Sequence, residues 1–297
     1  MSSAGEFATS AKNMEDLSSP FRETLMERIG TTEKLRHLIY SPAFDTAKFR
    51  GLASVLCVTD QRWLIVLRDD GGRVIAAESS YGATLLVELT IILLYGQLKI
   101  DYSHDGKAKS VFLHFNTVMQ YVYSEAVKSI LDTIDAHRDG VVTPKLSGTA
   151  LLSAWPLKFR NSSILYIPQP SQLLDGVCWE EMRGGFGPEL APAAALVVTN
   201  RHIIVIAEEK ISSWFQFRRS TKYGAIISYL PLNRFTGFKI KPQRHSRVLE
   251  LESRGNSGGE TLDITIPPNK EEAVRRAVEK ARRNRDPASN VLRVGFK

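Results

Sequence analysis

Short apolar runs that end in turn signals follow one another along most of this chain. Ala53–Thr59 and Arg62–Arg68 are rich in Val, Leu and Ile with Asp60-Gln61 between them, which predicts a hairpin or one long bent strand. The same pattern predicts further strands in the first half at residues 73–78, 83–89, 97–102 and 110–116. In the second half it predicts strands at 163–167, 194–208, 223–230, 235–241, 247–253 and 261–266.

Near the end of each half of the chain, the apolar residues change from a strand-like spacing to a helical spacing. Within residues 124–138 the apolar positions are spaced i, i+3, i+4 and i+7, at Val127, Ile130, Leu131 and Ile134. The same spacing returns in the second half at Val274, Ala277, Val278 and Ala281. This stripe is typical of an amphipathic helix, so we expect both halves to end in a helix that presses one face onto a sheet.

The two halves also share short sequence motifs. Residues 58–66 (VTDQRWLIV) return as residues 198–206 (VTNRHIIVI). Three further landmarks follow in the same order: Tyr81-Gly82-Ala83 with Tyr223-Gly224-Ala225, Lys99-Ile100 with Lys239-Ile240, and Glu125-Ala126-Val127 with Glu272-Ala273-Val274. Their order predicts a duplicated module of roughly 110–130 residues.

These patterns predict a division into five segments. Residues 1–33 form an N-terminal tail and a short helix, 34–138 a first domain, 139–151 a linker, 152–285 a second domain, and 286–297 a C-terminal tail. Many short strands followed by one amphipathic helix indicate an α+β fold. The expected form is two tandem β-barrels, each capped by its C-terminal amphipathic helix.

Composition is that expected of a soluble, cytoplasmic protein. Of the 297 residues, 43% are hydrophobic and 24% are charged. Cys57 and Cys178 form no dense framework, which predicts two reduced thiols. The most apolar run, residues 85–95, contains Glu88 and is too short to span a bilayer, and the N-terminus lacks an apolar signal core.

Charge is divided unevenly between the halves. Residues 1–150 hold 16 Lys and Arg against 18 Asp and Glu, a net charge of −2, whereas residues 151–297 hold 23 against 14, a net charge of +9. The halves therefore share a pattern but not a surface, and an anionic partner should prefer the second.

Two segments resemble a known family. Thr59-Asp60-Gln61-Arg62, a turn inside a strand pair, resembles the bacterial PH-like family and its GRAM-like relatives. Residues 228–238 (SYLPLNRFTGF) are similar to a strand of that family, which often reads isoleucine-proline, a polar turn and an apolar strand. The resemblance covers about residues 34–285 and implies tandem seven-stranded barrels, each capped by one helix. It further implies binding of lipid, peptide or protein, and self-assembly as in many bacterial members.

The first candidate binding site combines aromatic and cationic side chains within residues 214–222, at Trp214, Phe215, Phe217, Arg218, Arg219 and Lys222. Such a segment can dip into a membrane interface while its cations meet anionic headgroups. It can also contact a protein, or stack on bases and contact phosphates. The alternative is an edge hairpin whose aromatic side chains pack on the fold and whose cations are solvated.

Two further basic patches lie later in the second half. Lys239, Lys241 and Arg244 surround a strand turn and could hold phosphate if they converge. Arg275 and Arg276 lie in the basic last helix and could meet an acidic surface. The alternatives are a solvated hairpin and a helix whose late cations match its dipole.

No catalytic constellation is evident in the sequence. The six histidines lack metal-ligand spacing, and the glycine-rich run at residues 184–187 lacks the Lys-Ser/Thr ending of a phosphate-binding loop. We therefore expect a non-enzymatic interaction or assembly protein without metal or cofactor, whose basic second domain engages an anionic or protein partner. Among possible partners, we expect another protein or a second copy of this chain first, and an anionic membrane surface second. A nucleic-acid-associated accessory protein is the alternative.

Overall fold

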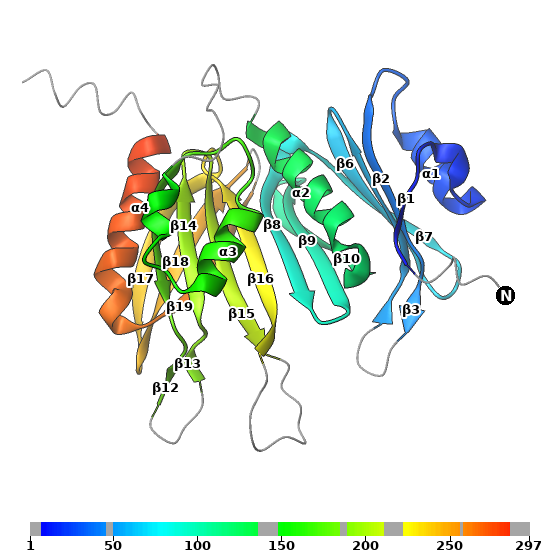
Figure 1. Ribbon diagram of the computed structural model, residues 1–297. Coiled ribbons are helices and arrows are strands. Elements are labelled where there is room, and N and C mark those ends of the chain that lie inside the picture. Colours follow the sequence, from blue (N-terminus) through cyan, green and yellow to red (C-terminus); the bar gives the residue numbers. More distant parts are fainter. Residues whose placement is uncertain are drawn as a thin grey trace, which may run out of the picture.

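The computed structural model describes residues 7–45, 50–135, 148–184, 189–210, 222–255 and 258–285. Two halves lie side by side (Figure 1). The first half has two α-helices, α1 (Ser19–Arg28) and α2 (Gln120–Asp135). Its strands are β1 (Thr9–Ser10), β2 (Leu35–Ser41), β3 (Phe44–Asp45), β4 (Arg50–Gly51), β5 (Ala53–Thr59), β6 (Arg62–Arg68), β7 (Val74–Ser80), β8 (Thr84–Ile92), β9 (Tyr95–His104) and β10 (Lys107–Asn116).

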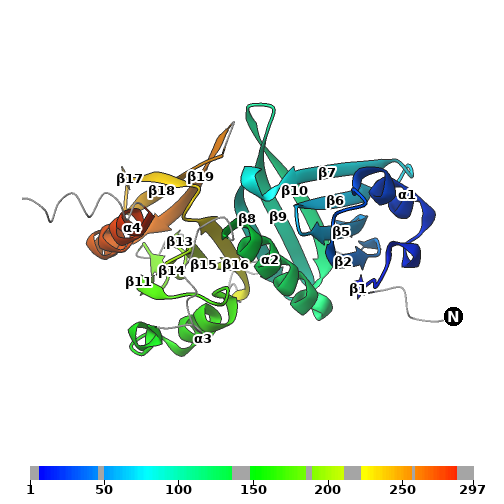
Figure 2. The ribbon, with the colours of Figure 1, turned by 90° about the horizontal axis from the view of Figure 1, so that it is seen from above.

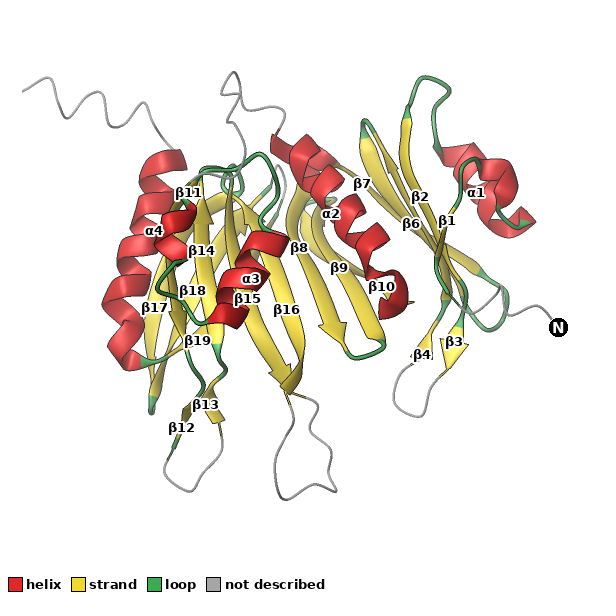
Figure 3. Ribbon diagram, viewed as in Figure 1, coloured by secondary structure: helices red, strands yellow, loops and turns green. Residues whose placement is uncertain are grey.

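Apart from β1, which has no counterpart, the second half repeats this order of strands and α-helices (Figure 3). It has the helices α3 (Leu157–Tyr166) and α4 (Glu271–Arg285). Its strands are β11 (Leu173–Trp179), β12 (Met182–Arg183), β13 (Glu189–Ala191), β14 (Ala194–Thr199), β15 (His202–Lys210), β16 (Lys222–Pro231), β17 (Phe235–Gln243), β18 (Ser246–Arg254) and β19 (Gly259–Ile266). Short 3-10 turns are η1 (Met14–Asp16), η2 (Tyr81–Ala83), η3 (Thr117–Met119), η4 (Thr149–Leu152) and η5 (Pro268–Lys270).

The prediction of an α+β fold made of two closed, helix-capped barrels is wrong, because the structure consists mostly of strands and none of its sheets closes. The described strands form open sheets in the orders β1-β2-β5-β6-β7, β10-β9-β8-β16-β15-β14-β11 and β17-β18-β19, with two small pairs, β3-β4 and β12-β13. The central sheet takes three strands from the first half and four from the second. Strand β8 pairs with β16 of the other half rather than with its chain neighbour β7, so neither half closes on itself.

The internal repeat extends to the strand registers. Strand β2 matches β11, and each carries a β-bulge directly after its first leucine, Leu35 or Leu173. Strand β8 matches β17, with Thr84 equivalent to Phe235, and the bulge that follows Thr84 in the β8·β9 pair returns after Phe235 in β17·β18. Since a β-bulge is a specific local feature, the shared bulges support duplication more strongly than the sequence motifs do.

The structure corrects two of the landmarks that the sequence placed in strands. Lys99 lies in β9 whereas Lys239 lies in β17, the equivalent of β8, so the two lysines are not equivalent. Tyr81 follows β7, whereas Tyr223 lies near the start of β16, the equivalent of β7. The mismatch arises because the chain between β15 and β16 is longer than that between β6 and β7, which shifts every later element of the second half.

The landmark in the closing helices is also misplaced, by one helical turn. Helices α2 and α4 begin at Gln120 and Glu271, which are equivalent positions. Val127 therefore corresponds to Val278 and not to Val274. Because the apolar stripe repeats at about each turn of a helix, a shift of one turn leaves the same pattern of buried positions.

The helices show where the sequence pattern succeeded and where it failed. The predicted apolar stripes of α2 and α4 are buried, which confirms both closing helices. In contrast, the strand predicted at residues 163–167 is wrong, because this segment ends helix α3. Helix α3 corresponds to α1, and each buries one phenylalanine, Phe21 or Phe159, on the first sheet of its half.

Helix α2 lies where the two halves meet (Figure 2). Its buried face packs into one large apolar core, together with Trp63 and Leu89 of the first half and Ile204 and Ile227 of the second. Since one core contains side chains from both halves, the packing holds the halves together.

Candidate functional site

The motif that repeats most clearly in the sequence has a structural role. The hydroxyl groups of Thr59 and Thr199 accept hydrogen bonds from the backbone N–H groups two and three residues ahead, at 2.8–3.1 Å. The next side chains, Asp60 and Asn200, accept from the backbone N–H that precedes the first long strand of each half, at 2.9 and 2.8 Å. The repeated Thr-Asp/Asn therefore closes a hairpin and ties it to the neighbouring strand.

The two halves are joined by edge-to-edge pairing of strands β8 and β16, which we call the joint. The β8·β16 register runs from Val87 opposite Tyr229 to Ile92 opposite Gly224. Leu89 and Ile227 face each other in the core. On the opposite face, the hydroxyl of Ser228 donates to the Glu88 carboxylate at 3.1 Å.

Glycine is required where this pairing ends. A Cβ at Gly224 would lie 2.7 Å from the Ile92 side chain and 2.9 Å from the backbone oxygen of Ile91. These separations are shorter than van der Waals contact, so the strands approach closely only because residue 224 has no side chain.

A buried ion cluster forms a second connection between the halves. Asp135, the last residue of α2, lies 2.8 Å from Arg201 Nε and 3.1 Å from His202 Nε2, both in the β14–β15 hairpin. Asp132, one turn earlier on α2, lies 3.0 Å from Arg201 Nη1. Burial by itself raises the pKa of Asp135, but the nearby His202 and Arg201 side chains outweigh burial and hold that pKa below its ordinary value.

The aromatic and cationic segment singled out in the sequence lies outside the described residues, at Trp214, Phe215, Phe217, Arg218 and Arg219. Lys222 begins β16, so its backbone is placed in the central sheet.

The cations of β17 are paired within their own hairpin. Lys239 lies 2.5 Å from Glu252, and Lys241 lies 2.6 Å from Glu250, both acidic residues being on β18. Arg244 is exposed in the β17–β18 turn. The three predicted residues are thus brought onto one hairpin, but two of them have neutralising partners across the strand pair.

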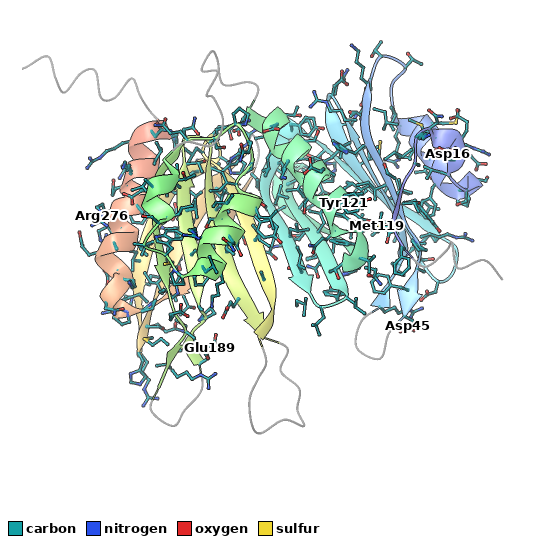
Figure 4. All side chains as sticks on the ribbon, viewed as in Figure 1. Asp16, Asp45, Met119, Tyr121, Glu189 and Arg276 are labelled. Atoms are coloured by element: carbon teal, nitrogen blue, oxygen red, sulfur yellow. The ribbon has the colours of Figure 1, made fainter. Side chains whose placement is uncertain are left out.

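The basic residues of α4 are divided between pairing and exposure. Arg275 lies 3.0 Å from Glu271, which also lies 3.0 Å from Arg247. Arg276 is exposed and points away from the molecule (Figure 4). Arg275 is therefore neutralised by a carboxylate of its own helix, whereas Arg276 faces solvent.

Several long strands lie at sheet edges, β10, β11 and β19 among them, and two others are the equivalents of the strands that join the halves. Strand β7 ends the five-stranded sheet and β17 ends the three-stranded sheet, and neither has a second strand neighbour among the described residues. They lie on opposite sides of the molecule in both views (Figures 1 and 2). An unpaired strand edge presents a row of backbone donors and acceptors, which makes it a binding surface for another strand.

An exposed apolar tip lies at the β8–β9 turn, beside the start of α2. Leu93 and Leu94 are 56% and 64% exposed, and the backbone N–H of Thr117 donates to the Leu94 carbonyl at 3.2 Å. Val118 and Tyr121 are also more than half exposed. Leu93 has a φ of +51°, which is unfavourable for a leucine.

The described residues offer little for catalysis. Burial raises the pKa of Cys57 to about 12, so its thiol is a poor nucleophile. An open groove of about 660 Å³ lies beside the start of α4 and is lined by Cys178, Glu180, Glu181 and Lys270, among others. Burial also raises the pKa of the Cys178 thiol. Over the described ranges, no three or more His, Cys, Asp and Glu side chains gather in a way that could hold a metal ion.

No protein-family model matches this sequence, and no curated protein matches it. The resemblance to PH-like domains therefore stays a prediction. In the described part of the chain, no helix has the length and apolar character needed to cross a membrane.

Sequence reasoning missed the joint between the halves and the open edges. A signal was present, because residues 85–95 are mostly apolar and place apolar side chains on both strand faces, with Glu88 and Thr90 as the polar exceptions. Such a run is typical of a strand in the middle of a sheet. Strand β17 instead alternates, with Lys239 and Lys241 on its exposed face.

Proposed function

We propose that this chain is a non-enzymatic interaction and assembly protein that binds partners by adding a strand to its open sheet edges. The observation that carries the proposal is the β8·β16 pairing, in which one half of the chain binds the other by edge-to-edge strand addition. The equivalents of these two strands, β17 and β7, keep the same edges open. The proposal places the protein in the cytoplasm, where its two free cysteines stay reduced.

A peptide of residues 73–80 (RVIAAESS) tests this proposal, because it carries the β7 sequence as an isolated strand. We expect saturable binding of the labelled peptide to the full chain by fluorescence anisotropy. Hydrogen exchange should then slow at the amides of β17. The same peptide with Ala76→Pro is the control, since proline removes a donor and resists pairing. Equal binding of the two peptides, or binding of neither, would contradict the proposal.

Attachment to an anionic membrane surface is the second candidate function. The apolar tip at Leu93, Leu94, Val118 and Tyr121 favours it, because exposed leucines beside a tyrosine suit the boundary between lipid chains and headgroups. Co-sedimentation with vesicles of phosphatidylcholine alone, or mixed with phosphatidylserine, tests it. We expect recovery with the mixed vesicles and its loss in Leu93→Asp/Leu94→Asp. Equal recovery with both kinds of vesicle, and equal recovery of the wild type and the variant, would exclude this candidate.

Engagement of another anionic partner, nucleic acid included, has less support. The described cations on β17 and α4 are largely paired, as Lys239, Lys241 and Arg275 illustrate, while Arg244 and Arg276 are exposed. A gel shift at low salt tests the nucleic-acid version, because backbone contacts weaken steeply as salt rises. Absence of a shift at low salt would exclude it.

A further inference from the structure

We infer that β17 of one molecule pairs with β7 of a second copy of this chain, in the antiparallel register that β8 and β16 use within the chain. The inference rests on the proposed function and names the partner. It follows from the repeat, because β17 is the equivalent of β8 and β7 is the equivalent of β16 in the same alignment of the two halves.

The alignment assigns a specific register to this contact. Within the chain, Val87 lies opposite Tyr229, Glu88 opposite Ser228, and Leu89 opposite Ile227. The equivalent pairs join β17 of one copy to β7 of the next. They place Phe238 opposite Glu78, Lys239 opposite Ala77, and Ile240 opposite Ala76. Pro242 has no N–H to donate, so the pairing is centred on residues 238–241 of β17.

The side chains of the two edges suit this register. Ile240 and Ala76 are both half-buried and lie at the margins of their cores, as Leu89 and Ile227 would if the halves were separated. Strand β7 carries no lysine or proline, which are the residues that usually protect an edge from pairing. Lys239 and Lys241 of β17 are already neutralised by Glu252 and Glu250.

The surroundings of the internal joint are also repeated at the open edges. Helix α3 packs beside the first sheet of the second half, and α1 packs in the equivalent place on the first half. The net charges of the halves, −2 and +9, favour contact between the second half of one copy and the first half of the next. The two halves that meet in this contact thus carry net charges of opposite sign.

The two edges differ and lie on opposite sides of the molecule, so the contact is head-to-tail (Figure 2). A second copy bound through β7 still exposes its own β17. Such a heterologous contact forms open chains, or rings where the rotation closes, and does not stop at a dimer.

Light scattering on the full chain provides the first test. We expect a mass that starts at 33.2 kDa at low concentration and passes twice that value as concentration rises. A constant monomer mass together with binding of the 73–80 peptide would overturn the inference but leave the proposed function standing. A constant monomer mass without peptide binding would remove both.

Disulfide trapping tests the register. Residues opposite each other in an antiparallel pair have Cα atoms about 4.5–5.5 Å apart, within disulfide range. We therefore expect Ala77→Cys/Lys239→Cys to form a ladder of dimers, trimers and larger species on mild oxidation. The control Ala77→Cys/Ile240→Cys places one cysteine on the opposite face of β17 and should form no ladder.

A mixture of two single variants tests the same contact without depending on the folding of the double variant. Ala77→Cys mixed with Lys239→Cys should give a cross-linked dimer and nothing larger, because each molecule has one engineered thiol at the contact. A ladder of equal strength in the Ile240→Cys control, or no cross-link in either experiment, would overturn the assigned register. A double variant that stops at the dimer would overturn the head-to-tail arrangement.

Discussion

His202 Nε2 lies 3.1 Å from Asp135 Oδ2, and both side chains are almost completely buried where the C-terminal end of α2 meets the β14–β15 hairpin. The contact joins the last helix of the first half to the first sheet of the second. It therefore contributes to the stability with which the two halves are held together.

Asp135→Asn should destabilise the protein by about 3 kcal/mol, because it leaves the charge of Arg201 without its buried partner. Urea unfolding at neutral pH measures this loss. The matched control is Asp132→Asn, which removes a carboxylate from the same helix and the same arginine. Its side chain is 41% exposed, so we expect a loss below about 1 kcal/mol. Equal losses would contradict a special role for Asp135.

The same pair predicts a pH dependence. Because the pKa of Asp135 lies below its ordinary value in the folded protein, its contribution is complete above the unfolded pKa of about 3.9. It is lost as the pH falls through the folded pKa. The stability difference between the wild type and Asp135→Asn should therefore shrink below about pH 4. A difference that grows on acidification would contradict this assignment.

The repeated hairpin predicts equal sensitivity at equivalent positions. Thr59→Val and Thr199→Val should each cost about 1–3 kcal/mol, because two backbone N–H groups lose their acceptor. Thr→Ser at either position keeps the hydroxyl and should retain most of the stability. Thermal unfolding followed by circular dichroism checks both pairs. An unchanged unfolding temperature in either valine variant would show that the hydroxyl is not needed to close the turn.

Gly224→Ala should weaken the joint. The new methyl group would contact Ile92 and the Ile91 carbonyl, and such overpacking costs about 1–3 kcal/mol. The control is Gly237→Ala in β17, where the nearest atom would lie at 3.5 Å and the residue sits on an open edge. We expect Gly237→Ala to be neutral in urea unfolding. Similar losses for both would mean that close approach at β8·β16 is not the cause.

Leu93→Asn should stabilise the protein by about 1 kcal/mol, since asparagine tolerates the left-handed conformation better than leucine does. Leu94→Asn is the control, because Leu94 is similarly exposed but has no positive φ. Differential scanning calorimetry compares the two. If Leu94→Asn and Leu93→Asn shift the melting temperature equally, the gain comes from removing surface hydrophobicity and not from relieved strain.

Much of the local structure could be predicted from the sequence. The hairpin at Thr59 and the closing helices follow from turn chemistry and apolar spacing, which act over a few residues. The strand predicted at residues 163–167 failed because a short apolar run fits either a strand or a buried helix. The repeat was detected, but its landmarks at Lys99 and Tyr81 were misaligned, because the longer chain between β15 and β16 shifts every later element of the second half.

The candidate surface was less predictable. The cations at Lys239, Lys241 and Arg275 stand out in the sequence, whereas their carboxylate partners are found only once strands and helix turns are paired. Residues 214–219 lie outside the described residues, so their role stays a prediction.

The sequence by itself determined most of the long strands, the two closing helices, the hairpin turns and the existence of two related halves, because each depends on short-range spacing and turn residues. It did not predict β2, β11 or α3. Only the tertiary structure decided that β8 pairs with β16 and that no barrel closes. Every strand edge offers the same backbone donors and acceptors, so the choice between β7 and β16 as the partner of β8 depends on the packing of α2 and Asp135 against the second half. In the same arrangement, β7 and β17 lie at sheet edges.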